Sequence, residues 1–453
     1  MAYDFDMVVI GGGAAGLTAA GISASLGART ALIEARRLGG DCTWFGCIPS
    51  KTLLHAAQAG ETFHAAMEKV RRVRQHVYEE ADAPPVIAKL GIEVMEKRAR
   101  FVDSHSIEAG GVRVSSRYFV IATGSTPRLP DIPGVAAERF LTNETVFQLV
   151  EMPRSLVILG AGPVGIEMAQ AFRRFGAEVT VVGHSPRILP RDDAELAGML
   201  EAHLRRAGIR FLLGRHADAA DLLRADAVLA ATGRRSDVSS LNLSAAGIVV
   251  GADGIQADHR CRTNVHHIFA AGDVAARYRF THMAEHTAKV AVTNALLHFP
   301  LSIDERGVAW CTFTEPEFAH AGRTEEQLRQ SGTRYEVYRF PYARIDRAVT
   351  DEATVGMIKV FARPWDGRVY GATILGARAG DLIAEYALAI RHRITLRRIA
   401  DTIHPYPTYA LGNRRAADQW YVRRQSPAVV RWLQRIFGYR GAVPPPPDPD
   451  RIL

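Results

Sequence analysis

A glycine pattern that occurs twice in the chain, each time between a short apolar run and a helix-forming stretch, constrains the fold more than any other feature. Its first copy, Gly11, Gly13 and Gly16, directly follows the apolar run 6–10. Glycines at this spacing let the backbone turn and approach a pyrophosphate, whose charge is stabilised by the free N–H groups and the dipole of a helix N-terminus. The next apolar run ends at Glu34, where a carboxylate can accept a hydrogen bond from a ribose hydroxyl. The pattern predicts a Rossmann-like unit that binds a dinucleotide.

The second copy of the pattern lies between the apolar run 155–159 and another helical stretch, and it predicts a second dinucleotide site. Its glycines are Gly160, Gly162 and Gly165. The strand that follows ends at His184 instead of an acid, which removes the usual partner of a ribose 2′-hydroxyl and leaves room for a 2′-phosphate. We therefore expect NADPH in preference to NADH, with His184, Arg187 and Arg191 as the nearby cations.

Strand-like runs that end in small residues divide the chain into units. Such runs close the two nucleotide regions at 118–125 and 227–237, and another places Asp273 at a strand end. From Val308 onward, alternating segments precede helical stretches, which indicates a mixed sheet with helices. We expect an α/β fold with two Rossmann-like domains, the second inserted in the first, and a C-terminal α+β domain. The expected bounds are 1–149 with 258–304, then 150–257, 305–424, and a tail at 425–453.

Composition excludes several other classes of protein. The chain has 453 residues and a formal charge of +8, but its basic residues do not accompany a nucleic-acid-binding motif, so we expect no nucleic-acid partner. Four cysteines are too few for a disulfide framework in a chain of this length, which favours a reducing compartment. Asp4 and Asp6 precede the apolar N-terminal stretch where a signal peptide would be basic. The sequence thus predicts a cytoplasmic protein.

Two cysteines, Cys42 and Cys47, lie close together in the segment GGDCTWFGCIPSK, before a helical stretch expected from about Lys51. Local unwinding of a helix would bring the two sulfurs together, and the N–H groups at a helix start lower the pKa of a thiol from its usual value of about 8.5. One sulfur can then be a stable thiolate, and we predict a redox-active pair. The other cysteines, Cys261 and Cys311, stand alone in strand-like contexts and are expected to pack in the core. We predict no resident metal site.

Together, these motifs resemble those of the class I flavoprotein disulfide reductases, the family of dihydrolipoyl dehydrogenase, glutathione reductase and mercuric reductase. The resemblance covers about residues 4–424 and includes the cysteine segment, both glycine patterns, the FAAGD run and the segment FTEPEFAHAG at 313–322. It implies that the first unit binds FAD, that the second binds NADPH or NADH, and that the third forms a homodimer in which each active site needs both chains.

The resemblance also implies roles for individual residues. Cys47 would be the sulfur nearest the flavin and Cys42 the thiol that meets the substrate. Lys51 would pair with Glu167 near the reactive nitrogen of the flavin, and Asp273 would contact the ribityl chain. The residues assigned to cofactor binding are Gly11, Gly13, Ala14, Ala15, Gly16, Glu34, Ala35, Gly40, Asp41, Lys51, Thr123, Gly124, Ser125, Gly160, Gly162, Pro163, Val164, Gly165, Glu167, His184, Gly233, Gly272 and Asp273.

The C-terminal part of the chain departs from the family pattern. Members that reduce disulfides carry a His, and five residues later a Glu, at the positions occupied here by Tyr406 and Leu411. A phenol with a pKa near 10 is a poor proton shuttle at neutral pH, although it can donate a hydrogen bond or contact a metal ion. Mercuric reductases also have a tyrosine there, but they add a C-terminal cysteine pair, and this chain has no cysteine after Cys311. His404 could substitute for the missing histidine, although a structural role is the simpler interpretation.

These observations predict an FAD-dependent NAD(P)H oxidoreductase that passes electrons through Cys42 and Cys47 to a thiol-reactive or metal-ion acceptor, with Tyr406 beside them. Two alternatives remain: a disulfide reductase with atypical acid–base residues, and a redox sensor or partner-docking flavoprotein.

After the resemblance ends, Ser426 and Pro427 predict the start of an amphipathic basic helix. Its apolar face could pack on its own dimer, lie on a membrane surface or bind a partner protein. The prolines at 444–447 predict a stiff, extended end.

Overall fold

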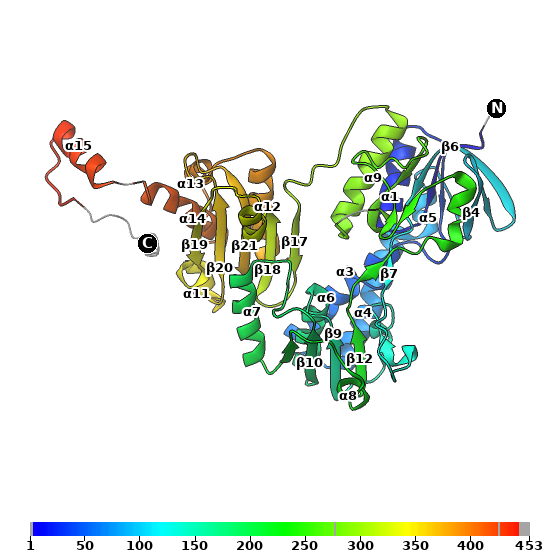
Figure 1. Ribbon diagram of the computed structural model, residues 1–453, viewed down its shortest axis with the longest axis horizontal. Coiled ribbons are helices and arrows are strands. Elements are labelled where there is room, and N and C mark those ends of the chain that lie inside the picture. The colour runs from blue at the N-terminus through cyan, green and yellow to red at the C-terminus, as the bar shows by residue number, and fades with distance from the viewer. Residues whose placement is uncertain (1–2, 276–277, 425, 444–453) are drawn as a thin grey trace. The chain divides into compact units, whose positions relative to one another are not determined.

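The computed structural model describes residues 3–275, 278–424 and 426–443. Its internal contacts divide the chain into two compact units, shown in Figure 1. The first unit comprises Met1–His184 and Ile209–Ile303, and the second comprises Ser185–Gly208 and Asp304–Leu453. The chain therefore leaves the first unit after β10 (Glu178–Gly183), returns to it at β11 (Arg210–Leu213), and leaves it again before β17 (Ala309–Thr312).

The first sheet of the first unit has seven strands in the order β3-β2-β1-β6-β5-β4, with β16 paired to β6. Its strands are β1 (Phe5–Ile10), β2 (Thr30–Ile33), β3 (Ile92–Met95), β4 (Ala99–Asp103), β5 (Ser106–Ala109), β6 (Val112–Ile121) and β16 (Ile268–Ala270). The pairs that involve β1, β2, β3 and β16 are parallel. Met7 and Val9 on β1 pack towards α1 (Ala14–Ser25) and α9 (Thr281–Leu296), whereas Val8 and Ile10 pack into the opposite layer. Because both faces of β1 are covered, its sequence is a continuous apolar run.

The second sheet of this unit has five parallel strands in the order β11-β10-β9-β12-β8. Its strands are β8 (Phe140–Leu141), β9 (Ser155–Leu159), β10 (Glu178–Gly183), β11 (Arg210–Leu213) and β12 (Ala227–Ala230). Two short antiparallel ribbons accompany the sheets: β7 (Thr126–Pro127) with β13 (Arg234–Arg235), and β14 (Val250–Gly251) with β15 (Gly254–Ile255).

The remaining α-helices of the first unit are α2 (Gly40–Trp44), α3 (Cys47–Gln58), α4 (Phe63–Val77), α5 (Pro84–Ala88), α6 (Pro163–Arg174) and α8 (Ala219–Leu223). Helix α3 packs on both α4 and α6, so the helix that begins at Cys47 contacts the helix that opens the second nucleotide pattern. The ring of Phe63 on α4 lies 5.8 Å from that of Phe172 on α6.

The second unit is built on a five-stranded antiparallel sheet in the order β17-β18-β21-β20-β19. Its strands are β17 (Ala309–Thr312), β18 (Glu317–Gly322), β19 (Glu336–Pro341), β20 (Met357–Ala362) and β21 (Val369–Gly376). Its helices are α7 (Ala194–Arg206), α10 (Glu325–Gln330), α11 (Asp346–Thr350), α12 (Ala379–Arg391), α13 (Leu396–Asp401), α14 (Leu411–Val422) and α15 (Pro427–Phe437).

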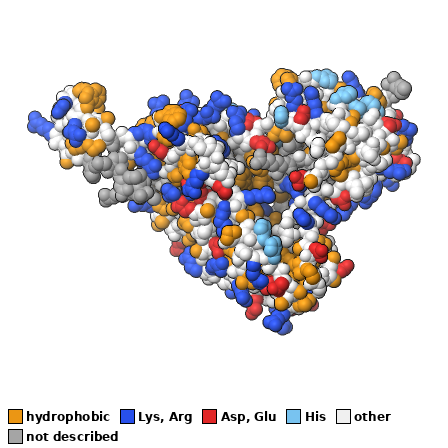
Figure 2. Space-filling model, in the orientation of Figure 1, with side chains coloured by type: hydrophobic (Ala, Val, Ile, Leu, Met, Phe, Trp, Pro, Cys, Tyr) orange, Lys and Arg blue, Asp and Glu red, His pale blue; other side chains and the backbone are white. Residues whose placement is uncertain are grey.

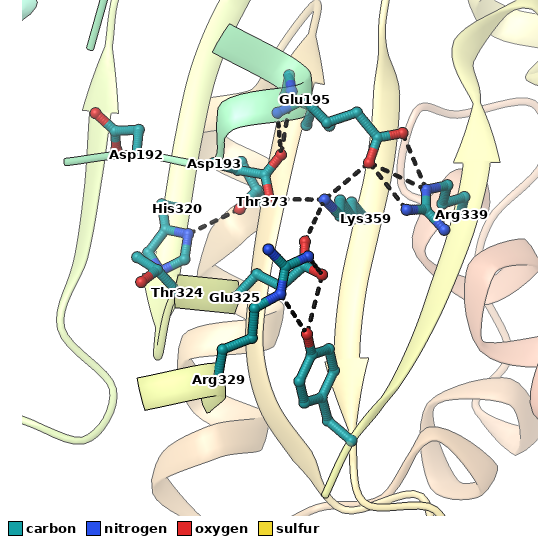
Figure 3. Close-up of polar contacts among 12 residues, drawn as sticks. Asp192, Asp193, Glu195, His320, Thr324, Glu325, Arg329, Arg339, Lys359 and Thr373 are labelled. Carbon is teal, nitrogen blue, oxygen red and sulfur yellow. Dashed lines mark hydrogen bonds and ion pairs between the residues drawn. The ribbon is translucent and has the colours of Figure 1, made fainter. Parts of the chain in front are cut away.

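A buried lysine joins α7 to this antiparallel sheet (Figure 3). Lys359 on β20 has a side chain that is 2% exposed, and its ammonium lies 2.8 Å from each of three carboxylates. Those carboxylates belong to Asp193, which also caps the N-terminus of α7, and to Glu195 and Glu325. Since a buried charge needs opposite charges and hydrogen bonds around it, the network holds α7 in the second unit.

The fold class predicted from the sequence is confirmed, because two Rossmann-like parallel sheets accompany an antiparallel sheet covered by helices. The domain bounds stay predictions. The strand-like context expected for Cys261 is wrong, because this buried residue lies in a turn with φ 62° and its thiol donates to the carbonyl of Thr287. Cys311 lies on β17 and packs against the core of the second unit, as expected. The prolines at 444–447 lie outside the described residues, within which no helix has the length and apolar character needed to cross a bilayer.

Candidate active site

The cysteine pair lies on two consecutive short helices of the first unit. Cys42 is in the middle of α2 and Cys47 is the first residue of α3. The helix expected from about Lys51 thus begins four residues earlier, at Cys47. Gly46, in a non-helical conformation, is its N-cap residue. Cys47 is exposed, Cys42 is partly exposed, and both are free thiols.

Cys47 is the member of the pair that holds negative charge. The hydrogen bond from Cys42 lowers the pKa of Cys47 to about 6, with further contributions from the hydroxyl of Thr281 and the charge of Lys51. The same interaction, together with burial, raises the pKa of Cys42. The sulfur of Cys47 lies 3.4 Å from the hydroxyl oxygen of Thr281. The lowered pKa favours the thiolate form of Cys47 over that of Cys42.

An ion pair lies one turn of helix beyond Cys47. The ammonium of Lys51 on α3 is 2.9 Å from a carboxylate oxygen of Glu167 on α6. The side chain of Glu167 is 6% exposed, so the pairing compensates a carboxylate that is almost fully removed from water. The two residues are in contact as the family resemblance implies, while their role beside a flavin stays a prediction.

The first glycine pattern forms a tightly closed backbone turn. A Cβ atom on Gly16 would lie 1.7 Å from the carbonyl oxygen of Gly11, and one on Gly40 would lie 2.6 Å from the Cα of Gly13. A Cβ on Gly272 would lie 3.0 Å from the Cβ of Ala15. Three segments that are far apart in the sequence, around Gly13, Gly40 and Gly272, therefore meet at the N-terminus of α1. Gly13 caps this helix without any side-chain hydrogen bond, which leaves its first N–H groups available to an anion.

The polar groups around this turn fit a dinucleotide. One carboxylate oxygen of Glu34 accepts from the N–H of Gly12 and the other from the N–H of Arg36, each at 2.7 Å, so the carboxylate is fixed just after β2. The buried hydroxyl of Thr123 has no hydrogen-bond partner among the described residues, as expected where a ligand would supply one. These observations fit FAD, which Glu34, Thr123 and the glycine turn would hold.

Arg234 connects three of the predicted cofactor residues. Its guanidinium donates to the hydroxyl and the carbonyl of Ser125, both at 2.7 Å, and lies 3.2 Å from a carboxylate oxygen of Asp41. Ser125 in turn donates to Asp273 at 2.6 Å. Arg234, the first residue of β13, therefore holds Asp41, Ser125 and Asp273 together.

The second glycine pattern repeats the geometry of the first. A Cβ atom on Gly165 would lie 2.0 Å from the carbonyl oxygen of Gly160. Helix α6 starts with Pro163 after Gly162, again without a side-chain cap, and Val164 beside it is 53% exposed. These features fit a second dinucleotide, whose pyrophosphate the N–H groups of α6 would bind.

The cations expected near a 2′-phosphate are only partly available. The guanidinium of Arg187 donates to the carbonyl oxygens of Leu189, Pro190 and Asp192, so it holds its own loop. The expectation that Arg187 is a cation for a 2′-phosphate is therefore wrong. His184 is exposed and its ring stacks on that of His216, with the ring centroids 6.1 Å apart. His184 thus stays a predicted cofactor residue, and we add His216 to the prediction because the two rings stack.

The residues that depart from the family pattern lie in the second unit. The side chain of Tyr406 is 69% exposed, and a hydrogen bond to Asp346 raises its pKa above the ordinary value for a phenol. Leu411 is buried at the start of α14. Both ring nitrogens of His404 lie within hydrogen-bond distance of acceptor oxygens, Nδ1 of the carbonyl of Thr402 and Nε2, at 3.0 Å, of the carboxylate of Glu385.

Among the described residues, no group of three or more histidine, cysteine or acidic side chains is arranged to hold a metal ion.

Two glycine turns of the dinucleotide-binding type, a neighbouring pair of cysteines and an antiparallel C-terminal domain are the features of a pyridine-nucleotide-dependent flavoprotein. Residues 5–288 match the family model described as pyridine nucleotide-disulphide oxidoreductase, and residues 308–416 match the dimerisation domain of the same family. The chain belongs to the pyridine nucleotide-disulphide oxidoreductase family. It is accordingly an oxidoreductase that binds FAD and NAD(P)H, and its dimerisation domain supports a homodimer.

Its relatives carry different names. The chain is 31% identical to a mercuric reductase of Lysinibacillus sphaericus, over 91% of this chain and 82% of that protein. It is 30% identical to a dihydrolipoyl dehydrogenase of Bacillus subtilis (strain 168), over 90% of this chain and 96% of the relative. Among solved structures, it is similar to the HOCl-induced flavoprotein disulfide reductase RclA from Escherichia coli, with a TM-score of 0.86, 29% identity, and coverage of 92% of this chain and 99% of RclA.

Reasoning from the sequence missed Thr281 and the bridging role of Arg234. A single threonine at the start of a helix carries no pattern that points to a sulfur far away in the sequence. Arg234 could have been found, because it directly follows Gly233 in the segment ATGRRSD that closes the second nucleotide region.

Proposed function

We propose that the chain is an NADPH-dependent flavoenzyme that reduces a thiol-reactive metal ion, such as Hg(II) or Cu(II), through Cys42 and Cys47. The observation that carries the proposal is the replacement of the family's acid–base pair by Tyr406 and Leu411. The relatives named mercuric reductase, and the structure of RclA described as a Cu(II) complex, support a metal-ion acceptor. That complex has a TM-score of 0.84 and 30% identity to this chain.

The proton balance explains why this replacement matters. Reduction of a disulfide by NADPH consumes one proton and yields two thiols, so a leaving thiolate must be protonated. Reduction of one Hg(II) to Hg(0), or of two Cu(II) to two Cu(I), takes the two electrons of one NADPH and releases NADP⁺ and one proton. A metal-ion acceptor therefore needs no general acid at the position of Tyr406, whose phenol stays neutral at physiological pH.

The cysteine pair has the chemistry that a soft metal ion requires. Cys47 is a thiolate above about pH 6 and Cys42 is partly exposed, so the pair offers sulfur ligands of the kind that soft cations prefer. FAD, when bound, accepts a hydride from the nicotinamide and supplies two electrons to the disulfide form of the pair. Within the chain, Lys51 and Thr281 stabilise the charge on Cys47, and Glu167 holds Lys51 in place.

A disulfide reductase is the second candidate, and one contact favours it. The ring of His404, whose side chain is 6% exposed, is held by Glu385 in a histidine–carboxylate pair of the type that serves acid–base catalysis. RclA, described as a flavoprotein disulfide reductase, and the relatives named dihydrolipoyl dehydrogenase support the same alternative. A redox sensor, in which turnover is incidental, is the candidate of a different class.

Anaerobic oxidation of NADPH by the holoenzyme, measured with Hg(II), Cu(II), quinones, lipoamide and glutathione disulfide, separates these candidates. We expect turnover with the metal ions above a control without enzyme, a loss of at least about a hundredfold in Cys42→Ser, and no change in His404→Gln. Faster turnover with lipoamide or glutathione disulfide that disappears in His404→Gln would establish the second candidate. If no acceptor supports turnover, the redox sensor is the remaining candidate.

A further inference from the structure

The segment 426–443 contains a helix whose start and end are set by its own sequence. The hydroxyl of Ser426 accepts a hydrogen bond from the N–H of Val429 at 3.1 Å, and Pro427 occupies the first helical position of α15. Gly438 ends the helix in the left-handed conformation with φ 69°. Both ends of the helix therefore carry residues that favour them, and the helix lies beyond residue 416, where the match to the dimerisation domain ends.

The apolar and polar residues of α15 lie on separate faces. At 100° per residue, one arc holds Val429, Val430, Trp432, Leu433, Ile436 and Phe437, and the other holds Arg431, Gln434 and Arg435. None of the helix residues is buried, and Trp432 and Phe437 are each 60% exposed. The ring of Tyr439 stacks on Phe437 with a centroid distance of 5.7 Å, which extends the apolar face past the helix. The six apolar residues of the first arc, together with Tyr439, are called the apolar face of α15 below.

The charge of this segment points to an anionic partner. Residues 426–443 contain three arginines, Arg431, Arg435 and Arg440, and no aspartate or glutamate. Figure 2 shows hydrophobic and basic side chains over α15. Aromatic side chains such as Trp432 and Tyr439 favour the boundary between lipid headgroups and acyl chains. A basic helix with a separate apolar, aromatic face is the type that lies in the plane of a membrane interface.

A second copy of the same helix is a poorer partner. Pairing of two such helices would bring arginines of both copies together without any acid in 426–443 to compensate them. The eleven residues of α15 are also too few to provide the surface of a standard protein interface, and a helix of this length is marginal in water without a partner.

We propose that α15 binds to the surface of anionic lipid bilayers, with its apolar face in the interface and Arg431, Arg435 and Arg440 towards the lipid headgroups. Such binding would localise the flavoprotein at a membrane surface without spanning it. The inference does not depend on which acceptor the cysteine pair reduces.

Co-sedimentation of the full-length holoenzyme with vesicles tests the proposal. We expect it to pellet with vesicles of equal parts phosphatidylcholine and phosphatidylglycerol, and to stay in the supernatant with phosphatidylcholine alone. The paired substitution Arg431→Gln with Arg435→Gln should weaken binding to the anionic vesicles about thirtyfold, because each basic residue near such a surface contributes about fivefold. The pair Trp432→Gln with Ile436→Gln should lower binding to the level of a chain that ends at Arg424.

Ala428→Gln is the matched control, because Ala428 is an exposed residue of the polar arc and the change adds no charge. It should bind as the unchanged protein does. Retention of flavin absorbance and NADPH oxidation shows that each variant is folded. Equal pelleting of the chain that ends at Arg424, or no pelleting of the full chain, would overturn the proposal. So would a change from dimer to monomer in Trp432→Gln with Ile436→Gln, measured by light scattering, because the apolar face would then belong to a protein interface.

Discussion

The hydroxyl of Thr281, the first residue of α9, lies 3.4 Å from the sulfur of Cys47, the first residue of α3. The N-termini of two helices therefore meet at the sulfur that carries the charge, and the hydroxyl supplies a hydrogen bond to it. This contact contributes to the low pKa of Cys47, which lies at about 6.

Thr281→Ala should raise the pKa of Cys47 by about one pH unit, since one hydrogen bond to a charged group is removed. The measurement is a pH titration of the thiolate-to-flavin charge-transfer absorbance in the reduced holoenzyme. Because the thiolate exists above its pKa, the absorbance is lost as the pH falls, and in the variant the loss should occur at higher pH. Thr52→Val on α3 is the control, as its hydroxyl donates to the carbonyl of Ile48. An unchanged midpoint in Thr281→Ala would contradict the role of this hydroxyl.

Tyr406→His should raise the rate of lipoamide reduction by about a hundredfold, because an imidazole titrates near neutral pH and a phenol does not. Metal-ion reduction should change little. Tyr406→Phe is the matched control and should leave lipoamide reduction as slow as in the unchanged protein. Steady-state rates with both acceptors check this expectation, and an equal response of the two acceptors to Tyr406→His would count against it.

His184→Asp should raise the KM for NADPH about tenfold or more, because a carboxylate after β10 repels a 2′-phosphate and can accept a hydrogen bond from a 2′-hydroxyl. The KM for NADH should stay the same or fall. His64→Asp introduces the same charge on exposed α4 and should alter neither value. Parallel changes in both KM values would indicate a general disturbance of the site instead of nucleotide selection.

Lys359→Met should destabilise the protein by about 3 kcal/mol, because three carboxylates would lose the buried cation between them. Thermal unfolding measures this loss. Burial raises the pKa of Glu325, but the bond and charge of Lys359, together with bonds from Tyr335 and Arg329, outweigh burial and hold that pKa below the usual value. The stabilisation is therefore present above the unfolded pKa and is lost as the pH falls through the folded pKa, so the two proteins should converge in acid. Arg329→Met, at a pair whose arginine is 68% exposed, should cost less than about 0.5 kcal/mol.

Asp192→Asn should stabilise the protein at neutral pH by roughly 2 kcal/mol. Burial raises the pKa of Asp192 to about 6, while the indole N–H of Trp310 donates to its carboxylate at 2.7 Å, a bond that an amide oxygen can also accept. The protonated acid favours the folded state, so the native residue loses stability as the pH rises through about 6, and asparagine does not. Unfolding temperatures at pH 4.5 and pH 8 check this, with exposed Asp131→Asn as the control. An equal effect at both pH values would contradict it.

The sequence predicted those parts of the molecule in which a residue type is dictated by backbone geometry. Gly16 and Gly165 are such positions, because any side chain there would overlap the carbonyl of Gly11 or Gly160. The burial of both faces of β1 and the Ser426 cap of α15 follow from local patterns in the same way.

Contacts between distant segments could not be predicted by such reasoning. Lys359 lies in an apolar strand, and the residues next to it in the sequence do not indicate that it pairs with the carboxylates of Asp193 and Glu325. The sequence shows that Arg187 follows β10, which suggested a phosphate ligand. It does not show the conformation of the loop, in which three carbonyl oxygens accept hydrogen bonds from the guanidinium.

The buried ammonium of Lys359 also bears on how parts of this chain can be exchanged with those of relatives. A chimera that replaces the whole of residues 150–257 would import a foreign α7 and leave Lys359 facing unmatched side chains. Exchange at His184 and Ile209, where the chain leaves and re-enters the first unit, would retain Asp193 and Glu195 with their lysine. In evolutionary terms, α7 and β20 should be inherited together even though more than 150 residues separate Asp193 from Lys359.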